Sequence, residues 1–195
     1  SLHATSVTLI DGGVFERNGG CGIVDVHSST TIYRNCVIRH NYPAGAQVSG
    51  LAHQFLNCRF YGNFDNQLSN CYQSNLGLVN CLIDGRGTDN GIVMENGRLD
   101  RCTVVNCKTG LLVLKSATVK NSVFSACQDQ LIVVRSGALP DFCLSKTLLN
   151  LGKATFGDKQ VADPAGWESL APEVKWATGV IIAAPALSGP DYVVP

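Results

Sequence analysis

A six-residue motif recurs along this chain at an almost constant interval, and this repeat limits the fold more than any other feature of the sequence. The clearest copies are Tyr33–Ile38, Phe55–Phe60 and Leu78–Ile83, which share a central Asn-Cys pair. Counted from the cysteine, or from the small residue in its place, successive copies are separated by 23, 22, 23, 21 and 20 residues. These origin residues are Gly13, Cys36, Cys58, Cys81, Cys102 and Ser122. Such a period is typical of a solenoid, in which each repeat forms one coil.

Apolar residues occupy two fixed places in every copy, three positions before the origin and two positions after it. Side chains of a straight strand alternate with a period of two, so an odd separation between inward-facing positions requires a bend between them. Four copies have an asparagine at that bend. These residues are Asn35, Asn57, Asn80 and Asn121. Asparagine tolerates the left-handed backbone conformation, and we expect each amide to stack on the next coil as a structural ladder. Asn18, Asn41 and Asn63, five residues past the origin, predict a second ladder that satisfies backbone groups at a turn.

A further strand is predicted about ten residues after the origin, most clearly over residues 22–26, 91–95, 110–114 and 130–134. Three short strands per coil predict an all-β fold, a right-handed parallel β-helix of about six to seven coils. The N-C-x-[IF] coils resemble the right-handed parallel β-helix (pectate-lyase-like) superfamily, and in particular bacterial β-helix repeat proteins. The resemblance covers residues 5–150 and implies fold more than activity, because this scaffold carries lyases, hydrolases, adhesins and proteins without known chemistry.

We divide the chain into a parallel β-helix over residues 1–150 and a C-terminal extension or cap over residues 151–195. Thr147 fits the origin of a seventh coil. The irregular extension is predicted to contain a short helix over Pro164–Leu170, with Asp163 as its N-cap. Val180–Ile182 and Tyr192–Val194 are predicted as final strands.

The charge and hydropathy of the chain narrow its partners. The sequence has 15 basic and 15 acidic residues, which removes the electrostatic reason to expect nucleic acid as a partner. No apolar run approaches the roughly 20 residues that cross a bilayer, so we expect no membrane insertion. The chain starts at Ser1 without an amphipathic helix over the first coil, so we expect a piece of a longer protein. The resemblance implies a bacterial protein that is extracellular or in the cell envelope, and a monomer is favoured.

The nine cysteines show none of the spacings of a zinc site. Cys36, Cys58, Cys81 and Cys102 share one inward column, and Cys107 with Cys127 a second. We expect them to be free thiols that pack as small apolar side chains. Disulfides between coils remain an alternative, because neighbouring coils lie about 4.8 Å apart.

The best candidate for a ligand-binding groove is formed by charged residues at the ends of the strands predicted over residues 91–95, 110–114 and 130–134. Glu95, Lys115 and Arg135 are spaced by 20 and 20 residues, and we expect them to stack on one face. Two adjacent cations offer a site for the carboxylate or sulfate of an acidic sugar. The alternative is that these charges only keep the strand ends soluble.

Asp25 and His27 are the other candidate groove residues. Both lie on the face of their strand opposite Val24 and Val26. Asp25 and Glu95 are three coils apart, roughly 14 Å at the usual coil spacing, which is too far for the carboxylate pair of a glycoside hydrolase.

The function favoured by these residues is a non-catalytic β-helix scaffold or carbohydrate-contacting module, with a polysaccharide or other glycan as partner. The alternatives are a polysaccharide lyase or related carbohydrate-active enzyme acting on an acidic polysaccharide, and a trimeric tailspike or adhesin. No cofactor is expected. Calcium is the one metal that the Asp84–Asn90 loop suggests, although the loop lacks the bidentate Glu of a calcium loop.

Overall fold

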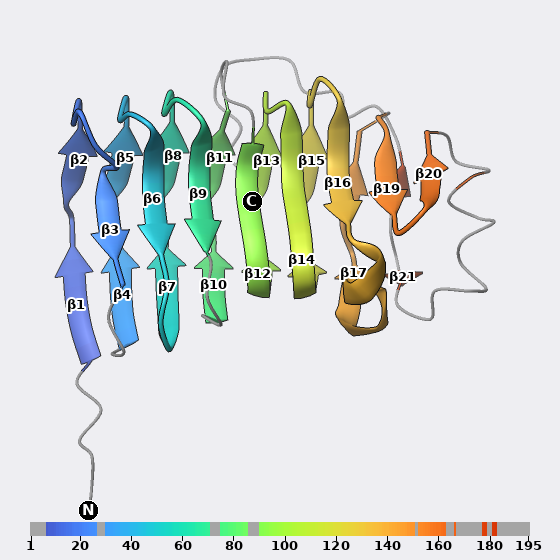
Figure 1. The fold of residues 1–195 in the computed structure, drawn as a ribbon, viewed down its shortest axis with the longest axis horizontal. Helices are drawn as coiled ribbons and strands as arrows, with labels where there is room; N and C mark the ends of the chain where they lie inside the picture. Colours follow the sequence, from blue (N-terminus) through green and yellow to red (C-terminus); the bar gives the residue numbers. More distant parts are fainter. Residues whose placement is uncertain are drawn as a thin grey trace, which may run out of the picture.

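The computed structural model describes residues 7–26, 30–70, 75–85, 90–150, 152–162, 166, 177–178 and 181–182. The strands in this part of the chain form three stacks that run along one axis (Figure 1). Each coil contributes one strand to each stack, and a strand pairs in parallel with its counterparts in the coils before and after. The structure is therefore a parallel β-helix, as the repeat predicts.

The first stack contains β1 (Val7–Asp11), β4 (Thr30–Arg34), β7 (Ala52–Leu56), β10 (Asn75–Val79), the second halves of β12 (Asn90–Asp100) and β14 (Thr109–Lys120), β17 (Phe142–Ser145) and β21 (Ala177–Thr178). The second stack contains β2 (Val14–Glu16), β5 (Val37–Arg39), β8 (Arg59–Tyr61), β11 (Leu82–Asp84), β13 (Thr103–Val105), β15 (Val123–Ser125), β18 (Leu148–Leu149) and β22 (Ile181–Ile182). The third stack contains β3 (Ile23–Asp25), β6 (Ala44–Val48), β9 (Asn66–Asn70), the first halves of β12 and β14, β16 (Gln130–Val134) and β19 (Ala154–Phe156).

The corner between the first and second stacks is the same in every coil. Two residues separate the strands at this first corner, for example Asn57 and Cys58 between β7 and β8. The first of the two has a positive φ in each coil. These residues are Gly12, Asn35, Asn57, Asn80, Arg101, Asn121 and Lys146. Asparagine and glycine accept this conformation at low cost, which explains the recurring Asn-Cys pair.

A second group of positive-φ residues follows the strands of the second stack, and no residue pattern predicts it. These residues are Arg17, His40, Gly62, Asn106 and Ala126. Only glycine and asparagine among them favour this conformation. The backbone therefore turns sharply here even where the side chain is poorly suited to the turn.

The core is filled by the two predicted apolar columns together with the thiols. Tyr33 and Phe55 stack with ring centroids 4.7 Å apart, and Phe55 meets Phe60 edge-on at 5.2 Å. The eight cysteines in the described part of the chain are free, as expected. Six of them, Cys36, Cys58, Cys81, Cys102, Cys107 and Cys127, donate hydrogen bonds from sulfur to backbone carbonyls; Cys58, for example, donates to Tyr33 O at 3.4 Å.

Both predicted asparagine ladders are present. Asn80 donates from Nδ2 to Asn57 Oδ1 at 3.0 Å, and Asn57 donates to Asn35 Oδ1 at 3.3 Å. The acceptor is an aspartate in two coils: Asn35 donates to Asp11 Oδ1 and Asn121 donates to Asp100 Oδ1, both at 2.8 Å. The second ladder joins Asn18, Asn41 and Asn63 and ends on Gln67, whose Oε1 lies 2.7 Å from Asn63 Nδ2.

The seventh coil is formed by β17, β18 and β19, with Thr147 fully buried at its origin. β20 (Lys159–Val161) then pairs antiparallel with β19. Of the predicted final strands, Ile181–Ile182 is present as β22. Tyr192–Val194 and, apart from Gly166, the helix predicted over Pro164–Leu170 lie outside the described residues.

Candidate ligand-binding groove

The outer face of the first stack has three columns of side chains in strict register. The middle column consists of Leu9, Ile32, Gln54, Gly77, Arg98, Thr118 and Cys143. Gly77 is the one member of this column without a side chain. A hollow of about 330 Å³ lies at this point of the face.

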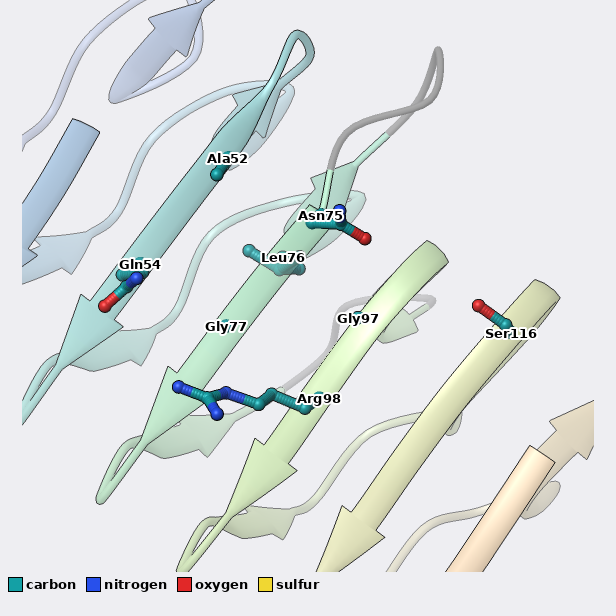
Figure 2. A pocket seen from close by; sticks show the side chains of 8 residues that line it. All are labelled: Ala52, Gln54, Asn75, Leu76, Gly77, Gly97, Arg98 and Ser116. Atoms are coloured by element: carbon teal, nitrogen blue, oxygen red, sulfur yellow. The ribbon is translucent and has the colours of Figure 1, made fainter. Parts of the chain in front are cut away.

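The hollow crosses four neighbouring strands (Figure 2). It is lined by Ala52, Gln54, Asn75, Leu76, Gly77, Gly97, Arg98 and Ser116. The side chain of Arg98 extends from β12 over β10, towards Gly77 and Gln54. A Cβ atom at Gly77 would lie 3.6 Å from Gln54 Cγ and 3.8 Å from Arg98 Nε. Because Gly77 has no side chain, its backbone forms the floor of the hollow, and the side chains of Gln54 and Arg98 lie beside this floor.

Three of the polar side chains around this floor have no partner within the described part of the protein. There, no hydrogen bond or ion pair involves the side chain of Gln54, Asn75 or Arg98. Elsewhere, polar side chains of neighbouring coils pair with one another; Arg34, for example, bonds to Asp11 in the adjacent column. The groove thus presents two amides and a guanidinium that are available to a ligand rich in oxygen atoms.

One edge of the groove is held in place by a buried amide. Asn70 is 1% exposed, donates to Asn96 O at 3.1 Å and accepts from the Glu95 backbone N at 2.5 Å. Asn96 in turn accepts a hydrogen bond from Ser116 Oγ at 3.0 Å. Because these contacts fix the backbone next to Arg98, this edge of the groove is rigid.

The predicted column of Glu95, Lys115 and Arg135 is only partly assembled. Lys115 Nζ forms an ion pair with Glu95 Oε1, at the corner that leads into the first stack. The side chain of Glu95 is only 13% exposed, so it is less open to a ligand than expected. The predicted offset of 20 residues is not kept towards Arg135, because β14 and β16 pair with an offset of 21 residues up to Val113 and Val134.

Asp25 lies inside the β-helix and not in a groove, which corrects the prediction. Its side chain accepts a hydrogen bond from the Tyr33 hydroxyl at 3.0 Å, while Val24 on the same strand is 59% exposed. Burial and the Asp25 carboxylate raise the pKa of Tyr33 above its ordinary value. The hydrogen bond from Tyr33 stabilises Asp25 in this inward position. His27 lies outside the described residues.

The chemistry of the groove favours binding. Its lining includes one cation and no carboxylate, whereas a glycoside hydrolase requires two carboxyl groups and a lyase requires a base. Within the described ranges, no group of three or more His, Cys, Asp and Glu side chains is arranged to hold a metal ion. Asp84, from the loop considered for calcium, accepts a hydrogen bond from Asn106 at 3.0 Å.

Sequence reasoning missed this groove, because it concentrated on charged residues at the strand ends. The available signal was Gly77 itself. A glycine inside a strand pattern marks a place where another group approaches the backbone closely. Gln54 and Arg98 become its neighbours only when the register between coils is known.

Comparisons with known proteins agree with this architecture. No curated protein matches the chain. In the described part of the chain, no helix is both long enough and apolar enough to cross a membrane. The family model of the right handed beta helix region matches residues 1–142, which is most of the sequence. The chain belongs to the right-handed β-helix family.

Proposed function

We propose that this protein is a non-catalytic, carbohydrate-contacting β-helix that holds a glycan along the outer face of its first stack. The observation that carries the proposal is the glycine-floored hollow, with the unused polar groups of Gln54, Asn75 and Arg98 around it. Sugars are bound through many hydroxyl contacts, and amide and guanidinium groups supply the donors and acceptors that hydroxyls need. A regular flat face also suits a chain of repeating units.

The Arg98 guanidinium adds a preference within this ligand class. A planar guanidinium binds a carboxylate or sulfate through two parallel hydrogen bonds. Acidic glycans therefore bind more tightly than neutral ones at this groove. The ligand is expected outside the cell, so the proposal includes a protein that is secreted or surface-attached as part of a larger bacterial polypeptide.

A glycan array, followed by titration calorimetry on the best ligand, tests the proposal. Gly77→Leu fills the hollow without altering an inward position and should abolish binding. Arg98→Ala should weaken binding of acidic glycans by about tenfold or more, the loss of one charged hydrogen-bond pair. Arg59→Ala is the matched control, because Arg59 is an exposed arginine on β8 in the second stack.

The alternative is a polysaccharide lyase that uses the Glu95 and Lys115 corner, which lies next to the Asn96–Ser116 edge of the groove. Formation of unsaturated uronates, followed by ultraviolet absorbance, separates the two functions. A signal that disappears in Lys115→Ala but survives in Gly77→Leu would replace binding with catalysis. Binding without any unsaturated product supports the non-catalytic function.

A further inference from the structure

Two aromatic rings stand exposed on neighbouring coils, away from the first stack. Tyr42 is 56% exposed and Phe64 is 60% exposed, and their ring centroids are 4.9 Å apart with the planes inclined at 55°. They occur in the turns that join β5 to β6 and β8 to β9, which lie side by side along one edge of the β-helix (Figure 1). Neither ring contributes to the buried core.

The backbone that presents these rings is fixed by the second asparagine ladder. Asn41 and Asn63, which immediately precede the two aromatic residues, are 2% and 1% exposed. Asn41 Nδ2 donates to Phe15 O at 3.0 Å, and Asn63 Nδ2 donates to Ile38 O at 3.1 Å. The rings are thus preorganised, and a ligand that stacks on them does not have to order the turns.

One side of the aromatic pair is open. The Tyr42 amide donates to Asn18 O in the preceding coil, and the residues that follow Asn18 are Gly19 and Gly20. A Cβ atom at either glycine would meet no atom within 4 Å. No side chain of the preceding coil therefore stands at these two positions beside Tyr42. On the other side of Tyr42, in the following coil, stands the ring of Phe64.

The two rings alone supply less area than a stable protein interface needs. A stable protein interface buries about 800 Å² on each side, whereas one large aromatic side chain buries about 150–250 Å². Pro43 and Asp65 flank the rings in the sequence, and Gly19 and Gly20 follow Asn18 in the preceding coil; none of these four adds a large apolar side chain. Two adjacent rings instead match the dimensions of one or two sugar units.

We propose that Tyr42 and Phe64 form a stacking site for the C–H face of a neutral pyranose. The negative faces of the rings attract the weakly positive axial C–H groups of the sugar. The Asp65 carboxylate, which has no side-chain hydrogen bond or ion pair among the described residues, accepts hydrogen bonds from the sugar hydroxyls. This inference rests on the proposed function for its ligand class, but it uses a different surface from the Gly77 groove and favours neutral rather than acidic sugars.

Saturation-transfer NMR with neutral oligosaccharides tests this site; the probes are cellohexaose, xylohexaose and laminarihexaose. At least one should receive saturation mainly at its ring C–H protons. Tyr42→Ala and Phe64→Ala should each weaken its binding about tenfold or more. Tyr42→Phe should keep most of the affinity, because the ring and not the hydroxyl makes the contact. Val24→Ala, at a residue 59% exposed, is the control and should change nothing.

The outcomes also separate this inference from the proposed function. If acidic glycans bind and respond to Gly77→Leu while no neutral probe binds, the aromatic site is wrong and the groove stands. Equal affinity in the Tyr42→Ala, Phe64→Ala double variant also overturns it. So does displacement of the sugar by tetramethylammonium at millimolar concentration, because that result indicates a cation site formed by the rings and Asp65. If neutral probes bind the rings while no glycan responds to Gly77→Leu, the groove is wrong and this site stands.

Discussion

His53 lies entirely inside the β-helix, with its Nε2 atom 3.3 Å from Asp25 Oδ2. The Tyr33 hydroxyl donates to the same oxygen at 3.0 Å. A carboxylate in a core is costly unless it has partners. These side chains come from β3, β4 and β7, so the cluster links the first three coils through polar contacts as well as apolar ones.

We predict that Tyr33→Phe destabilises the protein by about 1.5–3 kcal/mol, the usual value of a hydrogen bond to a charged group. The change keeps the ring that stacks on Phe55 and removes only the donor to Asp25. Urea denaturation measures the difference. Tyr42→Phe, at an exposed tyrosine, is the matched control and should be neutral. Equal stability of both variants would show that Asp25 does not depend on the Tyr33 hydroxyl.

Alkaline pH should weaken the protein through the same tyrosine. Burial, followed by the Asp25 carboxylate, raises the pKa of Tyr33 above its ordinary value of 10.0. Because the pKa of Tyr33 is higher in the folded than in the unfolded protein, the contribution of its hydroxyl to the free energy of unfolding is complete below pH 10.0. This contribution is lost as the pH rises above that value. Urea titrations at pH 8 and pH 11 should therefore show a smaller loss in Tyr33→Phe than in the parent. The buried Cys36 thiol also has a raised pKa, and the comparison with Tyr33→Phe cancels its effect.

Cavities in the same column should have different effects along the axis. Ile83 in β11 and Ile38 in β5 are both fully buried and occupy the same position of their coils. Replacement by alanine should cost about 2–5 kcal/mol at Ile83, because a middle coil supports neighbours on both sides. Ile38→Ala should mainly increase amide hydrogen exchange in β1–β9. Uniform loss of protection from Ile38→Ala would mean that the solenoid unfolds as one unit.

Two glycines of the first stack provide a matched pair of substitutions. At Gly97, with φ +157°, a Cβ atom would lie 2.1 Å from Leu76 O. At Gly77, the nearest atom would be 3.6 Å away. We expect Gly97→Ala to cost about 1–3 kcal/mol from overpacking against the backbone, and Gly77→Ala to stay within about 0.5 kcal/mol. Thermal unfolding of both variants checks the order, and the reverse order would contradict the register of β10 and β12.

Acid should loosen the first two coils. Hydrogen bonds from Arg34 and then Asn35 lower the pKa of Asp11, and the hydrogen bond from Arg39 lowers the pKa of Glu16. Because the pKa values of Asp11 and Glu16 are lower in the folded protein, their ion pairs stabilise it above the ordinary pKa values of 3.8 and 4.5. This stabilisation is lost as the pH falls below them. Carboxyl carbon shifts followed by NMR should give midpoints below these values. Midpoints at the ordinary values would show that the ion pairs do not persist in solution.

The sequence predicted those parts of the fold that each coil repeats. The inward columns and the bend at Asn35, Asn57 and Asn80 follow from residue types with a strong local preference, so they were visible without coordinates. The turns at Arg17, His40 and Ala126 were not, because tertiary pairing imposes a positive φ on residues that do not favour it.

The candidate site depended on contacts between coils, and there the sequence was a weaker guide. A constant spacing of 20 residues suggested that Lys115 and Arg135 are neighbours, but β14 pairs with β16 at an offset of 21. Asp25 was assigned to the outer face because it lies opposite Val24 and Val26, which were expected to point inward, whereas the Tyr33 hydroxyl makes an inward position of Asp25 tolerable. The groove arises because Gly77 has no side chain where the neighbouring coils have Gln54 and Arg98. Only the register of the paired strands shows that these three residues are neighbours.

The fixed length of the first corner limits how this protein can change over evolution. Two residues separate the strands there in all seven coils, and one inserted residue would turn the following strand inside out. The corner between the third and first stacks differs, because between the first and the seventh coil it ranges from continuous strand in β14 to seven residues between β16 and β17. Insertions and deletions are therefore tolerated at the corner between the third and first stacks and not at the corner between the first and second stacks. New loops can reshape the surroundings of the groove over a core that stays unchanged.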